Sequence, residues 1–497
     1  MKQGVSRRSF LCSAAGFLAA SPAFAAPPVL SLRPHIRPDS IHKLAEPAGE
    51  ALIARARLSG EVSFAVAEAT TGRVLENRVA ETGLPPASVT KVVTALYALE
   101  HLGAAHRFRT RLITTGPVVD GIVQGDLVLA GGGDPMLDTD ALAALASRLK
   151  KSGVRGVQGR FLVWGGAVAY ARQIDPEQPE HVGYNPAVSG LSLNFNRVHF
   201  EWKRAGKGWG VTMDARSDRH RPDVQMATMA VVQRDMPVYT YRDKGGMDSW
   251  TVASSALGNG GARWLPVRRP DIYAGEVFRT FARAHGIELK PETPVGALPA
   301  GTTLATHESD TLREILRGML KYSTNLTAEL VGMAATQARL GKTPDLQGSA
   351  REMSRWAAQR LGMTRARLVD HSGLGDGSRM SSLDMVRALV AARQSGPLPD
   401  LLKSVVMRDE KGRPQKSHPI AVRAKTGTLN FVSALAGYLS APDGSELAFA
   451  IFTADTPRRD RLSVAERERP QGGRQWNARS KSLQQALLQR WGALYGS

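Results

Sequence analysis

Ala87-Ser88-Val89-Thr90-Lys91 follows two prolines and opens a run of apolar residues that predicts a buried helix from Val89 to Leu99. Gly103 provides a stop signal for this helix. Ser88 and Lys91 stand three residues apart, so on a helix they share one face. A hydroxyl becomes a nucleophile when a nearby base takes its proton, and a partly neutral amine can be that base. The stretch therefore predicts a serine nucleophile with a lysine base.

The same Ser-x-x-Lys spacing also occurs at Ser40/Lys43 and Ser147/Lys150, so the pair alone is weak evidence. Two later polar clusters set Ser88 apart. Ser323-Thr324-Asn325 lies between two predicted helices, and Lys425-Thr426-Gly427-Thr428 continues a predicted strand. We therefore interpret the three clusters as parts of one site.

The chain is too long for a single core, and its pattern changes near residues 110 and 303. Between these points short strands and glycine turns predominate, with helices predicted at 139–150 and 272–285. On either side, helices alternate with a hairpin and an antiparallel meander. This predicts an α+β fold in which residues 110–303 form a mostly β insertion within a domain made of residues 26–109 and 304–497.

The individual elements follow from apolar periodicity and turn residues. Helices are expected at 41–58, 311–320, 326–338, 345–361, 382–395 and 478–494. Strands are expected at 62–66, 74–77, 420–424, 431–439 and 447–453, and residues 455–475 are expected to form a surface loop.

The first 25 residues are predicted to be an export signal rather than part of the fold. Arg7 and Arg8 precede a short, weakly apolar run, and Ala23-Phe24-Ala25 is typical of a cleavage site. Paired arginines favour the twin-arginine route, and an ordinary secretory signal is the alternative. The mature protein is expected to begin near Ala26 and to work outside the cytoplasm.

Composition excludes several other classes of protein. Cys12 is the one cysteine and lies within the predicted signal, so the mature chain is expected to contain no disulfide and no cysteine metal site. The 11 histidines show no metal-ligand spacing, and neither a metal nor another cofactor is expected. The net charge of +20 suits contact with anionic envelope surfaces. Nucleic acid is not an expected partner, because the arginines are scattered and export is predicted.

The ordered trio Ser88-Val89-Thr90-Lys91, Ser323-Thr324-Asn325 and Lys425-Thr426-Gly427-Thr428 resembles the three motifs of active-site-serine penicillin-binding proteins and β-lactamases. The 232 positions between Lys91 and Ser323 resemble the class C penicillin-binding proteins, the D-alanyl-D-alanine carboxypeptidase/endopeptidases of the penicillin-binding-protein-4 type. The resemblance implies a transpeptidase/β-lactamase-like domain, with an antiparallel sheet flanked by helices and an all-α subdomain. It also implies a periplasmic serine DD-peptidase that acts on peptidoglycan stem peptides and is inhibited by β-lactams.

The resemblance implies a role for each motif residue. Ser88 would attack the D-Ala-D-Ala carbonyl, with Lys91 as its base and with Ser323 helping Lys91 to return the proton to the leaving amine. Asn325 would position the substrate amide and orient Lys91. The remaining substrate-binding residues lie in the third motif. They are Lys425, Thr426 and Thr428, which suit the terminal carboxylate, and Gly427, which allows the substrate to approach closely.

The loop from Asp370 departs from the family pattern, because Gly375 and Asp376 stand where a serine and an arginine are usual. The missing arginine would bind an acidic side chain of the stem peptide. Asp376 is therefore expected to repel diaminopimelate, with Arg379 as a substitute cation. His371 in the same loop is expected to be exposed and not to be a base. Ser192-Leu193-Asn194 also fits the second motif, but it lies in the inserted region and is interpreted as structural.

Two alternatives remain open at this stage. A serine β-lactamase would share the three motifs, although the long insertion and the absence of a glutamate-bearing loop argue against it. A cell-wall-binding protein with a vestigial site would not need all three motifs intact. Acylation by penicillin separates an enzyme from a vestigial protein.

Overall fold

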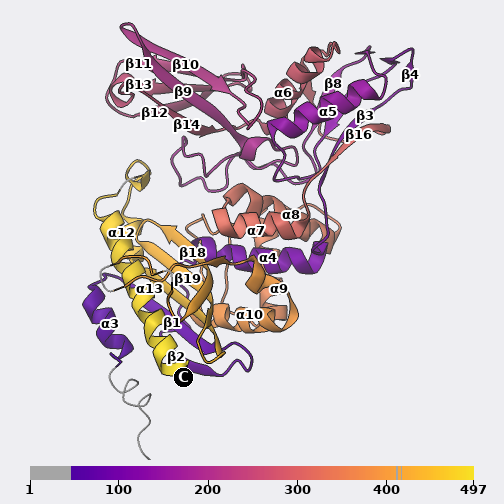
Figure 1. Ribbon diagram of the computed structural model, residues 1–497. Helices are drawn as coiled ribbons and strands as arrows, with labels where there is room; N and C mark the ends of the chain where they lie inside the picture. Colours follow the sequence, from indigo (N-terminus) through magenta and orange to yellow (C-terminus); the bar gives the residue numbers. More distant parts are fainter. Residues whose placement is uncertain (1–45, 410–411, 416, 469, 497) are drawn as a thin grey trace, which may run out of the picture. The chain divides into compact units, whose positions relative to one another are not determined.

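A six-stranded sheet carries the third polar cluster, with the order β17-β18-β19-β20-β1-β2. Its strands β18, β19, β1 and β2 can be followed in Figure 1. All neighbouring strands are antiparallel. The meander and the hairpin are both as predicted, and β20 joins them by pairing with β1. The strands are β1 (Glu61–Glu68), β2 (Val74–Arg78), β17 (Lys403–Ser404), β18 (Ala421–Leu429), β19 (Val432–Ser440) and β20 (Glu446–Ala454).

The computed structural model describes residues 46–409, 412–415, 417–468 and 470–496. The predicted export signal and the first residues of the helix predicted at 41–58 lie outside this range. Within it, that helix is α3 (Gly49–Ala56) and begins only after Pro47. None of the helices in the described residues has the length and apolar character needed to cross a membrane.

Helices cover both faces of the six-stranded sheet. One face packs against α3 and the last helix, α13 (Gly473–Tyr495), through large side chains such as Leu435 and Phe449. The other face presents small side chains such as Ala434 and Ala450, which pack against α10 (Ser382–Ser395) and share one hydrophobic cluster with the remaining helices. These helices are α4 (Thr90–Leu102), α7 (Leu312–Tyr322), α8 (Asn325–Leu340), α9 (Leu346–Leu361) and α10 (Ser382–Ser395), close to the predicted ranges. The small residues let the helices lie close to the strands.

The region between the first two polar clusters is mostly β, as predicted. A five-stranded sheet, in the order β15-β8-β6-β3-β16, is covered on one face by α5 (Thr139–Lys151) and α6 (Pro270–Ala284). Its strands are β3 (Arg109–Thr114), β6 (Leu127–Ala130), β8 (Phe161–Trp164), β15 (Glu292–Pro294) and β16 (Thr302–Glu308).

Three smaller sheets complete this region, in the orders β10-β9-β14, β11-β13-β12 and β4-β5-β7. The larger two are formed by β9 (Arg197–Ala205), β10 (Gly208–Asp214), β11 (Ala227–Val232), β12 (Tyr239–Asp243), β13 (Asp248–Ala253) and β14 (Gly260–Pro266). The smallest is formed by β4 (Val118–Val119), β5 (Ile122–Val123) and β7 (Gly156–Val157).

The segment 455–475 differs from its prediction as a plain surface loop. It contains α12 (Thr456–Asp460) and a short 3-10 turn, Glu466–Glu468. Arg459 on α12 is buried, and its guanidinium hydrogen-bonds the carbonyl of Asn430. The prediction was wrong because a charged, glycine-bearing sequence was equated with exposure, whereas these charges find partners inside the protein.

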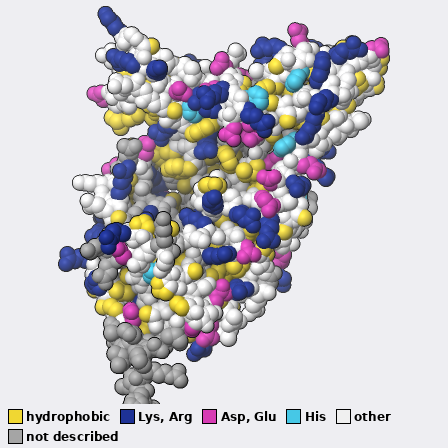
Figure 2. Space-filling model, in the orientation of Figure 1, with side chains coloured by type: hydrophobic (Ala, Val, Ile, Leu, Met, Phe, Trp, Pro, Cys, Tyr) yellow, Lys and Arg dark blue, Asp and Glu magenta, His cyan; other side chains and the backbone are white. Residues whose placement is uncertain are grey.

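The charged side chains are spread over the surface. On the face shown in Figure 2, lysine and arginine are distributed among acidic and apolar side chains and do not form one stripe. This distribution matches the scattered arginines of the sequence.

Candidate active site

Ser88 lies in a short 3-10 turn, Ala87–Val89, directly before α4. The turn packs against β18, and Ser88 itself is partly exposed. Ala87, just before it, has a φ of 46°, a left-handed conformation that costs a non-glycine residue about 1 kcal/mol or more. A strained backbone of this kind persists where the surroundings fix it, as at many active sites.

Lys91 begins the buried side of α4 and is fully buried. Its Nζ donates to Ser88 Oγ at 3.1 Å, to Asn325 Oδ1 at 2.8 Å and to the carbonyl of Ser372 at 2.8 Å. Burial lowers the pKa of Lys91 to about 8, while the charges of Asp370 and Glu329 act in the opposite direction. The amine is therefore held against the hydroxyl and is partly neutral near physiological pH.

The second cluster occupies the junction between two helices, as expected. Ser323 caps the end of α7 with a φ of 62°, and Asn325 begins α8. Asn325 uses both ends of its amide, because its Nδ2 donates to the carbonyl of Tyr184 at 2.9 Å. This orientation leaves Oδ1 facing the ammonium of Lys91.

Lys425 connects the third cluster with the second. Its Nζ donates to Ser323 Oγ at 2.9 Å and to the carbonyl of Thr426 at 2.8 Å. Burial, together with the positive charges of Lys91 and Lys403, lowers the pKa of Lys425 to about 6. Among the described residues this buried amine has no carboxylate partner, and a substrate carboxylate can supply one.

β18 presents the third cluster along an edge. Beyond Arg423 and Ala424, which pair with β17, no described strand pairs with β18 on the side away from β19. The residues Lys425 to Thr428 lie on this edge, which is where an extended peptide can add as a further strand.

A glycine is needed at position 427 for a structural reason that the sequence did not suggest. A Cβ at this position would lie 2.8 Å from the carbonyl oxygen of Pro86 and 3.1 Å from the nitrogen of Ser88. The absent side chain therefore allows β18 to approach the turn that carries Ser88, in addition to any approach by substrate.

Two buried carboxyl groups near Lys91 were not among the predicted site residues. Glu329 lies on α8, four residues after Asn325, and its Oε2 accepts from the backbone N–H of His371 at 2.9 Å. Asp370 accepts from the N–H groups of Gly373 and Gly375, each at 2.6 Å. Burial raises the pKa of Glu329 to about 8 and also raises that of Asp370. An acidic residue on the helix face of Asn325, within an apolar stretch, was the signal for Glu329.

The expectation that His371 is exposed is wrong, because its side chain is fully buried. Its imidazole contacts Ser349 Oγ at 2.8 Å and the sulfur of Met353 at 3.3 Å, and burial lowers its pKa to about 3. Gly332 on α8 leaves the room for it, since a Cβ there would lie 2.2 Å from the ring. His371 is a neutral core residue that fixes the loop carrying the Ser372 carbonyl.

The expectation for Asp376 also needs correction. Its carboxylate is paired with Arg459 and, at 2.8 Å, with Arg467. Arg379 does not reach the carboxylate and instead donates to the carbonyls of Asp376 and Ser378. The charge that was expected to repel an acidic substrate is thus compensated from segment 455–475.

Ser192 is structural, as interpreted. It is buried, donates to the carbonyl of Ser189 at 2.8 Å and accepts from Asn196 Nδ2 at 3.0 Å. Within the described part of the chain, no group of three or more His, Cys, Asp or Glu side chains has an arrangement suited to a metal ion.

Comparison with protein families shows that the sequence matches a known family. The model of the D-Ala-D-Ala carboxypeptidase 3 (S13) family matches residues 48–472. The chain belongs to this family. It is accordingly a serine D-Ala-D-Ala carboxypeptidase, and the resemblance to class C penicillin-binding proteins of type 4 is confirmed.

Curated relatives extend over most of the chain. A D-alanyl-D-alanine carboxypeptidase of Actinomadura sp. is 30% identical over 81% of this chain and 79% of its own length. A D-alanyl-D-alanine carboxypeptidase of Haemophilus influenzae is 23% identical over 79% of this chain and 85% of its own length.

A solved structure supports the fold class. The crystal structure of penicillin binding protein 4 from Haemophilus influenzae matches with a TM-score of 0.70 at 19% identity. The match covers 82% of this chain and 93% of the other. The predicted α+β fold is confirmed.

Proposed function

We propose that this enzyme removes the terminal D-alanine from peptidoglycan stem peptides through an acyl-enzyme on Ser88. The observation that carries the proposal is the position of Lys91, which is buried and donates to Ser88 Oγ, Asn325 Oδ1 and the Ser372 carbonyl. With a pKa of about 8, roughly a tenth of Lys91 is neutral at pH 7 and able to accept a proton.

In the acylation step Ser88 Oγ bonds to the carbonyl carbon of the D-Ala-D-Ala peptide bond, and its proton passes to Lys91. The backbone N–H groups of Ser88 and Thr428 would hold the oxyanion without reorganising. The C–N bond then breaks, and the proton returns through Lys91 and Ser323 to the leaving amine. Water later hydrolyses the ester and releases the shortened stem peptide.

Substrate would lie along the edge of β18. Lys425, with the hydroxyls of Thr426 and Thr428, would bind the terminal carboxylate, while Asn325 positions the substrate amide. The carboxylate also supplies the anion that the buried ammonium of Lys425 lacks, so binding raises the pKa of this lysine and takes up a proton.

The test is acylation by labelled penicillin followed by peptide mapping, together with release of D-alanine from a soluble pentapeptide. The label is expected on Ser88 and is expected to be lost in Lys91→Ala. Label on Ser323 or Ser192, or no label, would contradict the assignment. Release of D-alanine together with slow loss of the penicillin label marks a peptidase, whereas rapid turnover of penicillin marks a β-lactamase.

Two further parts of the proposal concern location and cross-links. Export through the signal at residues 1–25 would place the mature enzyme in the periplasm, and N-terminal sequencing is expected to start near Ala26. Cleavage of peptide cross-links uses the same acyl-enzyme with a different leaving amine, and digestion of purified cross-linked muropeptides measures it. Residues 110–303 are proposed to act as an insertion in the catalytic domain of residues 26–109 and 304–497.

A further inference from the structure

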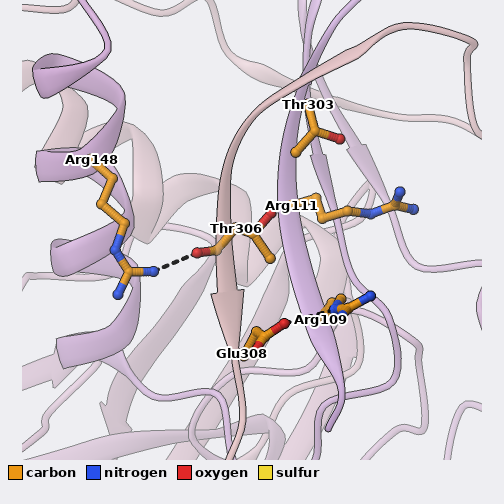
Figure 3. A pocket seen from close by; sticks show the side chains of 6 residues that line it. All are labelled: Arg109, Arg111, Arg148, Thr303, Thr306 and Glu308. Atoms are coloured by element: carbon orange, nitrogen blue, oxygen red, sulfur yellow. Dashed lines mark hydrogen bonds and ion pairs between the residues drawn. The ribbon is translucent and has the colours of Figure 1, made fainter.

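The open groove at the edge of the five-stranded sheet does not direct its polar groups toward one ligand. Its lining residues are Arg109, Arg111, Arg148, Thr303, Thr306 and Glu308. Arg148 donates to the carbonyl of Thr306, and the guanidinium of Arg111 points away from it (Figure 3). Arg109 is paired with Glu308 at 2.9 Å. Polar groups converge instead in the interior beside α4, around His371.

His371 is bonded to three helices. Its backbone N–H donates to Glu329 Oε2 on α8 at 2.9 Å, and its carbonyl accepts from Thr94 Oγ1 on α4 at 2.6 Å. Its imidazole Nε2 lies 2.8 Å from Ser349 Oγ on α9. All four side chains are buried. Residue 371 therefore has a fixed place relative to α4, α8 and α9.

The protons of this hydrogen-bond chain can be assigned from its far end. Thr336 Oγ1 donates to the carbonyl of Gly332 at 3.1 Å, and Ser349 Oγ donates to Thr336 Oγ1 at 2.7 Å. Because a hydroxyl has one proton, Ser349 accepts from His371, whose Nε2 carries the hydrogen. Burial lowers the pKa of His371 to about 3, so the ring is neutral.

The backbone after His371 connects this chain to Lys91. Thr94 and Lys91 lie one turn apart on α4. Their side chains donate to consecutive carbonyls of the loop, those of His371 and Ser372. A displacement of residue 371 would therefore move the Ser372 carbonyl away from the lysine.

The acceptors around Lys91 decide where its lone pair points. A neutral amine has two hydrogens and one lone pair. The Ser372 carbonyl and Asn325 Oδ1, each 2.8 Å from Lys91 Nζ, can only accept, so the two hydrogens are used there. The lone pair then faces Ser88 Oγ at 3.1 Å, which has a proton to give.

Packing alone does not explain a histidine at this position. Gly332 lies inside α8, where glycine costs about 1 kcal/mol relative to alanine. A Cβ there would lie 2.2 Å from Nδ1 of the His371 ring. An apolar side chain at 371, with alanine at 332, would fill the space without this cost and without needing a hydrogen-bond partner.

We propose that His371 is a positioning residue of the acylation step. Its ring, anchored on α9, keeps the Ser372 carbonyl on Lys91 and thereby directs the lone pair of the neutral amine at Ser88. His371 itself transfers no proton and has no contact with substrate. This inference rests on the proposed roles of Ser88 and Lys91.

The test measures acylation by penicillin in stopped flow and separates noncovalent binding from the limiting acylation rate. Rates are expressed per molecule that labelled penicillin titrates at completion, so unfolded protein is not counted. His371→Ala is expected to lower the limiting rate at least about tenfold, because a misplacement of about 1 Å among reacting groups is costly. The noncovalent binding constant is expected to stay within about twofold of the parent value. A purely structural role would change the titre and the melting temperature but not this rate.

Ser349→Ala removes the acceptor of the ring and is also expected to lower the limiting rate. His371→Gln keeps a side-chain amide that can donate to Ser349, and it is expected to react faster than His371→Ala. The double variant His371→Ala/Ser349→Ala is expected to be no slower than His371→Ala, because both substitutions break one contact. The matched control is Ser63→Ala on β1, three strands from β18, which loses a buried 2.8 Å hydrogen bond to Ser382 and is expected to react at the parent rate.

The tautomer of His371 gives an independent readout. In protein labelled with ¹⁵N-histidine, the signals that disappear in His371→Gln are expected to show a proton on Nε2 and none on Nδ1, at neutral pH and still at about pH 5. A proton on Nδ1 would overturn the route through Ser349.

Parent limiting rates in both His371→Ala and Ser349→Ala would overturn the inference. If His371→Ala does not fold, a parent rate in Ser349→Ala overturns it alone. A parent protein without label on Ser88 would refute the proposed function, whereas label on Ser88 with parent rates in the variants refutes only the role of His371.

Discussion

At the scale of single residues, the candidate site is distinguished by ionisable side chains that are buried and have few charged partners. Lys91 and Lys425 are both fully buried, and so are Glu329 and Asp370. Taking an ionised group out of water costs several kcal/mol unless a partner compensates. The two carboxyl groups offset part of this cost for Lys91. Lys425 has only neutral hydrogen-bond acceptors among the described residues.

Glu329→Gln is expected to move the alkaline rise of kcat/KM to lower pH, by less than about one unit. Lys91 acts as a base only when neutral, so activity rises as pH passes through its pKa of about 8. Glu329 raises that pKa through its charge, and glutamine reproduces only the uncharged form. Because the charges of Lys91 and Glu329 interact, the measurement gives an apparent pKa for the site rather than for Lys91 alone.

The control for this experiment is Glu329→Ala, which also removes the acceptor for the N–H of His371. It is expected to lose about 1–3 kcal/mol of unfolding free energy, whereas glutamine keeps the acceptor. The role given to Glu329 would be contradicted if kcat/KM of Glu329→Gln rose at the same pH as that of the parent enzyme, or at a higher pH.

Lys425→Met is expected to raise the melting temperature by several degrees at pH 6 while abolishing D-alanine release. The pKa of Lys425 is about 6 in the folded protein and 10.5 in the reference state, so the unfolded chain binds more protons between these values. Stability therefore rises with pH across this window. The gain in melting temperature from Lys425→Met is therefore largest below about pH 6 and decreases toward pH 10.5. Melting curves at several pH values measure it, and a lower melting temperature at pH 6 would refute it.

At the scale of elements, the active site is a contact between a strand and a turn. β18 meets the turn of Ser88 through Gly427, and the loop after Asp370 meets the same turn at Gly373. Gly373 has a φ of 75°, and a Cβ there would lie 1.9 Å from the carbonyl oxygen of Ala87. Two glycines thus bring two elements from different parts of the chain onto the turn that carries Ser88, the proposed nucleophile.

Gly427→Ala is expected to slow acylation by penicillin at least about tenfold. The new methyl group would press on the backbone of Pro86 and Ser88, and a misplacement of about 1 Å at a nucleophile is costly for catalysis. Stopped-flow acylation measures the effect. Gly318→Ala, at a helical position where a Cβ has open space, is the matched control and is expected to react normally. If Gly427→Ala is acylated at the parent rate, the turn of Ser88 can shift to accommodate the methyl group without loss of reactivity.

At the scale of the whole molecule, segment 455–475 connects distant parts of the chain. Arg459 and Arg467 hold Asp376 of the loop that begins at Asp370, while Arg467 also donates to the carbonyl of Glu177. Glu468 pairs with His181 and Arg263 of residues 110–303. The segment therefore joins the Asp370 loop to residues 110–303 through charges.

Asp376→Arg is expected to destabilise this junction rather than to improve binding of diaminopimelate. A third guanidinium would face Arg459 and Arg467 in place of their shared carboxylate, at a cost of about 3–5 kcal/mol. The measurement is limited proteolysis of segment 455–475 together with the melting temperature. Asp376→Asn is the milder comparison. If proteolysis and the melting temperature are unchanged in both variants, the ion pairs of Asp376 with Arg459 and Arg467 do not stabilise this junction.

The sequence predicted the elements well where periodicity and turn residues agree, as in α4, α8 and the meander of β18 to β20. It also predicted that the Ser88/Lys91 pair lies near Asn325. It did not predict the burial of His371 or the partners of Asp376. Those depend on space beside Gly332 and on arginines more than 80 positions away, and no local pattern carries such information.

The pairing of β1 with β20 has a consequence for the order in which the protein can be built. These strands are about 380 positions apart, so β1 leaves the ribosome long before its neighbour is synthesised. Contacts of such long sequence separation form slowly, and an unpaired strand edge invites association with other chains. During refolding, reactivity toward penicillin should therefore be the last property to return, after tryptophan fluorescence, to which residues 110–303 contribute most of the tryptophans, has reached its native value.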